Sequence, residues 1–531
     1  MSIDQLQQYR KKVQEIAAQE GTKEKGREAG GNNDEPPLEF VKECYNANEV
    51  GDSLLYNFLH RDRYISNVIA KFEDSWMKYM GPHWDDDFHK QSTSDVEQVA
   101  LQYLRMLPEI EEALSGLEGT KNSDPDKKMW LAKRKDLLER VKKLRSYRGR
   151  NAVLGCAVSN SDPLTVHPDQ LDQYPWLLPV ENGIIDLSTG EFTEGGDPSL
   201  FLTMAAPTKW TGLDTPCPHW EQYLRDVLDN DQEVIDYLQR ILGYSITGLR
   251  SERLFVVFYG PHGQNGKGTL IETVDSVLGN FAAPVETELL MSQRFAKSTS
   301  GPSPELMALK AKRIIYASET EKNHSFAAGK IKRFSGGDKI IGRGLQASKQ
   351  TIFYPSYVLY LICNDLPSAP PRDSAFWERI KVFLFPFSFL PNPTEEHHRP
   401  VNRDLPKHLE AERSGILAWL VRGCLEWQRK GLIPPAKVVS DSKNYREHED
   451  DLQHFLEECC HINMDDASKD NRIQSSTIYS LFKQWWEANN STRAMNQKDF
   501  STQLQQKGYI KVKDDKIFYQ FLTPKIDAGG I

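Results

Sequence analysis

Residues 258–279 read FYGPHGQNGKGTLIETVDSVLG. An apolar strand is expected to end at Tyr259, and a glycine-rich loop follows from Gly260 to Gly266. A helix is expected next, because apolar side chains recur on one helical face at Leu270, Val274, Val277 and Leu278. A strand, a glycine-rich loop, a lysine and a helix N-terminus in this order predict a phosphate-binding loop.

The residue types of this loop suit a nucleotide. Glycines let the backbone turn so that its N–H groups point at a phosphate, and the helix N-terminus adds partial positive charge. Lys267 is placed to reach the β- and γ-phosphate oxygens. We therefore expect ATP and Mg²⁺ as cofactors, with nucleotide contacts from Gly260, Gly263, Asn265, Gly266, Lys267, Gly268 and Thr269.

The loop departs from the common pattern in two places. Five residues instead of four separate Gly260 from Gly266, and Gly268 follows the lysine where Ser or Thr is usual. The hydroxyl comes one place later, at Thr269, which is the candidate Mg²⁺ ligand. The competing interpretation is an ordinary glycine-rich turn with a surface lysine.

Four short apolar runs surround the loop in the sequence and are separated by helical patterns. Runs of this kind fit strands buried on both faces of a parallel sheet. They cover residues 253–260, 312–319, 357–364 and 380–387. The sequence thus predicts an α/β P-loop ATPase core.

Polar residues at the ends of these runs are candidates for catalysis. Glu319, with Glu321 as second choice, follows the second run and is expected to hold Mg²⁺ and orient water. Asn364 ends the third run, where an amide can sense the γ-phosphate, and Arg379 precedes the fourth. Either carboxylate could instead be a solvated surface group.

Five ordered motifs resemble those of superfamily 3 helicases, specifically the helicase part of poxvirus- and phage-type primase–helicases. The similar segments are GPHGQNGKGT, IIYASETE, IKRFSGGDKIIGR, LICNDLP and FWERI, and LPVENGIIDLSTGEF resembles the segment before the motor. The resemblance spans roughly residues 38–390. It implies an AAA+-like core and a homo-hexameric ring with ATP between subunits, translocating 3′ to 5′ on single-stranded or forked DNA.

The same resemblance implies roles for individual residues. Asn364 inherits the sensor role, and Arg379 is expected to act on the ATP of a neighbouring subunit. Lys332 and Arg333 are candidates for further phosphate contacts. A hairpin in the channel of the ring is expected to carry DNA, with Lys349 as the first candidate contact and Lys339 as the second; each lysine could also be a solvated surface residue.

The rest of the chain is expected to form three further parts. Residues 1–37 predict a helix and a flexible linker, and residues 38–210 predict a mainly helical and then β-rich N-terminal domain. The ATPase domain is expected at 211–390. Residues 391–531 read as helical and end in two helices and a hairpin, 475–490, 496–508 and 509–522, which predict a winged-helix domain.

Charge and composition narrow the functional classes. The net charge is −9, but residues 250–390 contain 18 Lys and Arg against 12 Asp and Glu, so that segment carries +6 and the remainder −15. The middle segment is the part suited to nucleic-acid phosphates. Seven cysteines contain no CxxC pair, which favours reduced thiols over a metal site. The absence of a long apolar run or signal sequence predicts a cytoplasmic protein of a bacterial host or virus-infected cell, without a membrane partner.

Alternatives remain open at this point. The only dense acidic cluster before the loop, Asp85-Asp86-Asp87, has no convincing partner strand, so we expect no primase activity and a separate primase or other replication proteins as partners. The chain could be a DNA-binding ring ATPase that remodels an origin or partner without processive unwinding. A nucleoside monophosphate kinase-like phosphotransferase is the third interpretation, because its loop also ends in GKGT.

Overall fold

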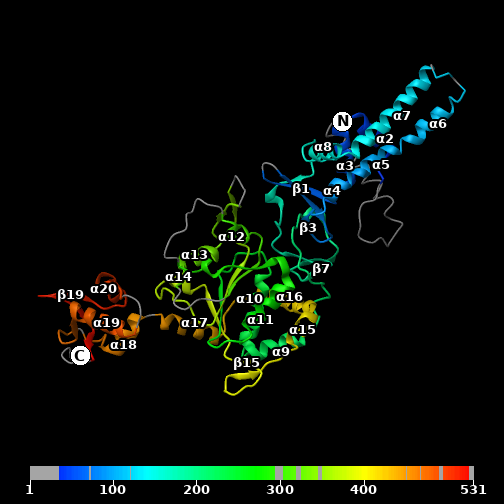
Figure 1. Ribbon diagram of the computed structural model, residues 1–531. Coiled ribbons are helices and arrows are strands. Elements are labelled where there is room, and N and C mark those ends of the chain that lie inside the picture. The colour runs from blue at the N-terminus through cyan, green and yellow to red at the C-terminus, as the bar shows by residue number, and fades with distance from the viewer. Residues whose placement is uncertain are drawn as a thin grey trace.

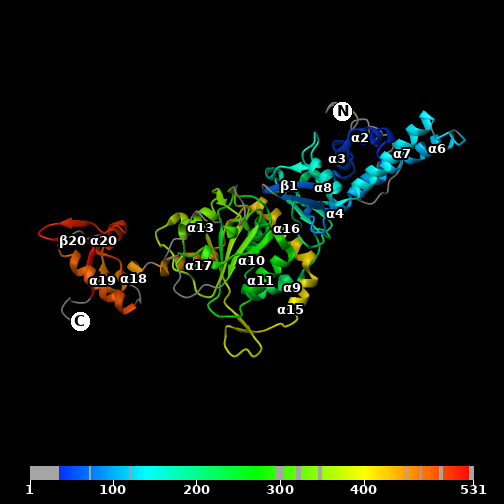
Figure 2. The same cartoon turned by 45° about the horizontal axis from the view of Figure 1, so that its top comes forward.

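The computed structural model describes residues 35–525 except for short gaps at 71–72, 120, 123, 293–302, 319–324, 345–349, 450, 467 and 490–493. The described chain forms three lobes in a row, with the N-terminal helices at one end and the C-terminal residues at the other (Figures 1 and 2). A parallel sheet occupies the middle lobe. The predicted helix over residues 1–20 and most of the predicted linker lie outside the described residues.

The N-terminal lobe combines helices with a small sheet. Its helices pack around a core that includes Phe40, Tyr56 and Leu137. They are α2 (Leu38–Asn46), α3 (Asn48–His60), α4 (Gln91–Ser94), α5 (Val96–Leu104), α6 (Leu107–Ser115), α7 (Pro125–Leu144) and α8 (Tyr147–Ala157). The sheet has the order β3-β2-β1-β4, from β1 (Tyr64–Ala70), β2 (Glu73–Tyr79), β3 (Trp84–Asp86) and β4 (Thr165–Val166).

This sheet corrects one expectation. The Asp85-Asp86-Asp87 cluster was expected to lack a partner strand, but Asp85 and Asp86 lie on β3, which pairs with β2. The strand escapes a reading of the sequence because it is short and both of its aspartates are exposed. Only Trp84 is buried, so the apolar alternation that would reveal a strand is missing.

A second small sheet connects this lobe to the middle one. The β-rich segment expected before residue 210 contains β5 (Leu177–Val180), β6 (Gly183–Asp186) and β7 (Glu191–Glu194), an antiparallel sheet of order β5-β6-β7. A 3-10 helix (Pro198–Leu200) follows. Leu178 and Ile185 from this sheet belong to the same hydrophobic core as the central sheet.

The central sheet has five parallel strands in the order β14-β8-β13-β10-β9. All four predicted strands are confirmed, as β8 (Phe255–Tyr259), β10 (Ile314–Ser318), β13 (Val358–Cys363) and β14 (Ile380–Leu384). The edge strand β9 (Ala282–Pro284) was not expected, because it contains only three residues and ends in proline.

Alternate residues of these strands face two different cores. Val256 and Phe258 of β8 pack with the helices α10 (Gln232–Ser245), α11 (Lys267–Leu278) and α16 (Arg413–Lys430). Phe255 and Val257 pack on the other face, toward α13 (Ala328–Phe334) and α14 (Ser374–Trp377). Burial on both faces explains why the strands read as continuous apolar runs rather than as an alternation.

Short elements complete the middle lobe. They are two 3-10 helices (Gly279–Phe281 and Thr287–Leu289), α12 (Pro304–Met307), the antiparallel pair β11 (Ile340–Gly342) and β12 (Thr351–Phe353), the parallel pair β15 (Ser388–Leu390) and β16 (His398–Pro400), and α17 (Ala436–His448). No helix within the described ranges is long and apolar enough to cross a membrane.

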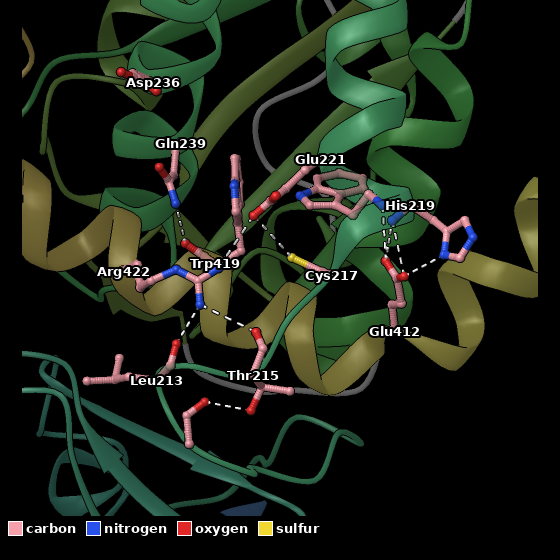
Figure 3. Close-up of polar contacts among 12 residues, drawn as sticks. Leu213, Thr215, Cys217, His219, Glu221, Asp236, Gln239, Glu412, Trp419 and Arg422 are labelled. Carbon is pink, nitrogen blue, oxygen red and sulfur yellow. Dashed lines mark hydrogen bonds and ion pairs between the residues drawn. The ribbon is translucent and has the colours of Figure 1, made fainter.

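The helices after residue 390 are joined to the segment before the central sheet (Figure 3). Glu412, between α15 (Leu405–Ala411) and α16, accepts hydrogen bonds from the backbone N–H groups of His219 (3.1 Å) and Trp220 (3.0 Å) at the start of α9 (Pro218–Val227). The Arg422 guanidinium donates to the carbonyl of Leu213. The main core thus contains residues from both sides of the expected domain limits at 210 and 390, as it runs from Leu178 to Val438.

The C-terminal lobe has its own core, which includes Phe455, Phe482 and Tyr519. Its elements are α18 (Asp451–Cys459), β17 (Cys460–Ile462), β18 (Arg472–Gln474), α19 (Ser475–Asn489), α20 (Gln497–Gln506), β19 (Lys511–Lys513), β20 (Ile517–Gln520) and β21 (Leu522–Pro524). The two predicted helices and the hairpin are therefore confirmed as elements, the hairpin being the antiparallel pair β19–β20.

Candidate nucleotide-binding site

The glycine-rich loop lies between the end of β8 at Tyr259 and the start of α11 at Lys267. Gly266 has φ +87°, a left-handed conformation that favours glycine. A Cβ on Gly260 would lie 1.9 Å from the Asn265 amide nitrogen and 2.8 Å from Lys267 Nζ. The loop thus closes tightly over its own lysine, and a side chain at Gly260 would displace it.

Contacts from distant segments hold the loop in this shape. The Ser388 hydroxyl donates to the carbonyl of Gly263 (2.8 Å), and the Phe389 N–H donates to the carbonyl of Gln264 (2.8 Å). The Tyr223 hydroxyl donates to the carbonyl of Gly266 (2.6 Å). Sequence reasoning did not find these supporting residues, because nothing local to Tyr223 or Ser388 indicates a partner in the loop.

Lys267 is the most unusual group of the site. Its side chain is only 4% exposed, and its ammonium donates to Asn265 Oδ1 (2.5 Å), Asn364 Oδ1 (2.8 Å) and the Gly260 carbonyl (3.4 Å). Burial lowers the pKa of Lys267 to about 8. Because these three acceptors are neutral, they orient the positive charge without cancelling it. A buried cation held in this way is suited to an anionic ligand.

The loop residues and Asn364 are brought together as expected. Asn364 follows the carboxyl end of β13, which lies directly beside β8, and Cys363 pairs with Tyr259 in the register. Gly268 and Thr269 lie in the first turn of α11, where N–H groups are free of helical partners. The Thr269 side chain is half-buried, and its carbonyl accepts a hydrogen bond from the Thr273 hydroxyl (2.7 Å).

Glu319, Glu321 and the hairpin lysine Lys349 lie outside the described residues. Strand β10 ends at Ser318, which pairs with Ile362 of β13. The carboxyl end of β10 therefore lies beside the carboxyl end of β13, which Asn364 follows. In open parallel sheets, ligands bind outside the carboxyl ends of the strands, at the point where the strand order reverses.

Arg379 lies at the opposite end of the parallel strands, where the strands begin. Its carbonyl accepts a hydrogen bond from the N–H of Phe255, at the start of β8, whereas Lys267 follows the end of that strand. The side chain is 8% exposed, and its guanidinium donates to the carbonyl of Ala375. Burial, followed by the charge of Arg253, lowers the pKa of Arg379. A single chain therefore does not bring Arg379 to the glycine-rich loop.

The other predicted basic residues make their contacts with residues outside the loop. Lys332 forms an ion pair with Asp373 (2.6 Å), which lowers the pKa of that carboxyl group. Arg333 is exposed, with its guanidinium over the ring of Phe334. Lys339 is exposed just before β11, and its Nζ lies 5.6 Å from the centre of the Tyr354 ring.

Two family models match the chain. A model described as "D5 N terminal like" matches residues 59–229, and one described as "Poxvirus D5 protein-like" matches residues 447–524. Neither match includes the glycine-rich loop. The matches therefore support the family on evidence that is independent of the loop motif.

Viral proteins named as putative helicases are similar to this chain. One from Acanthamoeba polyphaga mimivirus is 27% identical over 432 residues, which cover 78% of this chain and 44% of the relative. One from Frog virus 3 is 27% identical over 244 residues, or 44% of this chain and 24% of the relative. One from Sputnik virophage is 24% identical over 259 residues, which cover 46% of this chain and 32% of the relative. The chain spans less than half the length of these curated relatives.

Among solved structures, the apo C-terminal region of NrS-1 is similar at 11% identity and a TM-score of 0.46, covering 89% of this chain and 99% of that one. The mixed α/β architecture with a parallel sheet is established by the strand pairing described above. Together with the helicase-named viral relatives, the two D5 matches support similarity to the poxvirus D5-type primase–helicase family, with its helicase part.

Proposed function

We propose that the chain is an ATP-driven DNA helicase of superfamily 3, acting as a hexameric ring in the replication of a virus, phage or mobile element. The observation that carries the proposal is the buried Lys267 ammonium, held by neutral oxygens of Asn265 and Asn364 at the carboxyl edge of the sheet. Helicase-named viral relatives support the same class.

The chain's own residues have distinct roles in ATP hydrolysis under this proposal. N–H groups of the loop and of the first turn of α11 bind the phosphates, and Lys267 compensates the charge that develops on them. Thr269 and Glu319 are the proposed ligands of Mg²⁺, which supplies further charge compensation when bound. The side-chain N–H of Asn364 donates to the γ-phosphate while its oxygen accepts from Lys267, so Asn364 distinguishes ATP from ADP.

The ring is proposed because, in the part of the chain that the structure describes, Arg379 does not lie at the glycine-rich loop of its own subunit. A phosphoryl-transfer site commonly needs an arginine near the transferred group. Arg379 lies at the opposite end of the central strands from Lys267, too far around the sheet to serve its own loop. If the end of the sheet that carries Arg379 contacts the loop of a neighbouring subunit, Arg379 completes the ATP site of that subunit. Hydrolysis is then coupled to movement between subunits.

DNA is proposed to pass through the channel of this ring. Residues 250–390 carry a net charge of +6 in a chain of net −9, which supports contacts to a nucleic-acid backbone. The pair β11–β12 is the proposed DNA-contacting hairpin, with Lys349 and Lys339 as its basic residues. Movement along a strand without regard to sequence requires phosphate contacts rather than base readout.

The C-terminal lobe is proposed to be a winged-helix domain. Helices α19 and α20 followed by the β19–β20 hairpin support this assignment, with residues 496–507 as the recognition helix. The expected divisions at 37, 210 and 390 remain proposals for domain limits. A winged helix would also serve a ring ATPase that remodels an origin without processive unwinding, which is the second candidate function.

Unwinding of a forked DNA duplex with ATP and Mg²⁺ tests the proposal. The native chain is compared with Lys267→Ala, which removes the buried ammonium, and with Lys310→Ala, which removes an exposed lysine that precedes β10. We expect strand displacement and DNA-stimulated hydrolysis from the native chain and Lys310→Ala, and neither from Lys267→Ala.

The other outcomes discriminate the alternatives. Hydrolysis that DNA stimulates, without strand displacement, would favour the remodelling ATPase over the helicase. Hydrolysis that ignores DNA would contradict both and would point to a small-molecule phosphate acceptor, as in a nucleoside monophosphate kinase. Native-like hydrolysis by Lys267→Ala would remove the observation on which the proposed site depends.

A further inference from the structure

A cluster of metal-ligating side chains lies on the segment that joins β15 to β16. Glu395, His397 and His398 each offer one ligand atom, and these atoms all lie within 4.8 Å of one another. It is the one group of at least three such residues found within the described ranges. The Glu395 carboxylate already lies 3.4 Å from His397 Nδ1, close to the separation of two ligands on one tetrahedral ion.

The local backbone holds His398 in place. Its Nδ1 accepts hydrogen bonds from the backbone N–H groups of Thr394 (3.3 Å) and Glu395 (3.2 Å). These bonds are at the long end of the usual range, so the imidazole can exchange them for a metal–nitrogen bond. The pairing of His398 with Ser388 fixes the position of the segment relative to β15.

The cluster is connected to the glycine-rich loop. The His397 ring stacks on the ring of His262, with centroids 4.2 Å apart and planes at 26°. Ser388 and Phe389 of β15 donate hydrogen bonds to the carbonyls of Gly263 and Gln264 in the same loop. In Figure 1 the segment around β15 projects from the middle lobe as a loop, here called the β15–β16 loop. A ligand that held the β15–β16 loop in place would therefore also support one side of the glycine-rich loop.

We propose that Glu395, His397 and His398 bind one divalent transition-metal ion of the zinc class. Two imidazoles and a carboxylate suit zinc, whereas a hard ion such as Mg²⁺ prefers oxygen ligands alone. Three protein ligands leave a coordination position open to water. The bound ion fixes the β15–β16 loop and, through the His397–His262 stack, supports the glycine-rich loop from outside the nucleotide site.

The test measures Zn²⁺ binding directly and does not depend on ATP hydrolysis. The tag-free full chain is stripped with a chelator, dialysed and titrated with ZnCl₂ by calorimetry. We expect one Zn²⁺ per chain, and binding at least tenfold weaker in His397→Ala, His398→Ala and Glu395→Gln. His89→Ala removes an exposed histidine elsewhere and is the matched control. Circular dichroism checks that every variant folds.

Titration with Co²⁺ and hydrogen exchange give further readouts. A nitrogen–oxygen site should produce visible absorption bands with Co²⁺ in the native chain but not in His397→Ala. Zn²⁺ should slow backbone exchange over residues 260–266 and 391–400 in the native chain. The absence of a stoichiometric Zn²⁺ site, or equal binding by the three variants and the native chain, would overturn the proposal even if the chain proved to be a helicase.

Discussion

Lys267 donates a hydrogen bond of 2.8 Å to the side-chain oxygen of Asn364, although 97 positions separate the two residues in the chain. Parallel pairing of β8 with β13 makes this contact possible, because it places Tyr259 opposite Cys363 at one edge of the sheet. Lys267 begins the helix after one strand, and Asn364 follows the other. The contact joins the phosphate-binding candidate to the sensor candidate.

Replacing Asn364 tests whether it acts on the transition state. We expect Asn364→Ala to lower kcat for ATP hydrolysis by about 100-fold, since removing one positioned hydrogen-bond donor typically costs that much. Nucleotide affinity should change only a few-fold, because Lys267 and the loop remain. Steady-state hydrolysis and binding of a fluorescent ADP analogue measure the two quantities. A parallel loss of affinity and kcat would assign Asn364 to nucleotide binding instead.

The lowered pKa of Lys267 predicts a pH dependence of nucleotide binding. The free ammonium loses its proton near pH 8, whereas a bound phosphate favours the charged form. Affinity for ADP should therefore be nearly constant below about pH 7 and fall by about tenfold between pH 7 and pH 9. Calorimetry at several pH values measures this fall. Lys267→Arg supplies the control, because a guanidinium stays charged and any binding that it retains should not change over this range.

Two glycines of the loop should respond differently to alanine. A Cβ on Gly260 would collide with the Asn265 amide and Lys267 Nζ, whereas a Cβ on Gly263 would meet nothing within 4 Å. We expect Gly260→Ala to weaken ADP binding at least tenfold and Gly263→Ala to bind like the native chain. Melting temperatures should show that both variants fold. Equal binding by the two variants would mean that the loop has a different shape when nucleotide is bound.

Mixed rings test whether Arg379 serves a neighbouring subunit. Lys267→Ala and Arg379→Ala should each be inactive alone. When equal amounts of the two variants are mixed, about a quarter of random interfaces combine an intact lysine with an intact arginine from different subunits. Hydrolysis should then recover toward about a quarter of the native rate. No recovery in rings that demonstrably exchange subunits would place Arg379 and Lys267 in the same subunit's site.

The sequence by itself determined the central architecture. Continuous apolar runs revealed β8, β10, β13 and β14, because strands buried on both faces carry little else. The glycines and Lys267 revealed the loop, because few residue types permit that backbone and that charge. The position of Asn364 followed for a related reason, because it comes directly after an apolar strand and so lies at the carboxyl ends of the parallel strands.

The tertiary structure decided what depends on distant neighbours. Strand β3 has exposed aspartates and no alternating pattern, so only its pairing with β2 identifies it. The contacts of Tyr223 and Ser388 with the loop join segments that no local pattern connects. The low pKa of Lys267, the position of Arg379 at the opposite sheet edge and the stacking of His397 on His262 likewise arise from burial and strand order. A sequence specifies such relationships only through the complete fold, because the free energy of each contact depends on groups brought together from far along the chain.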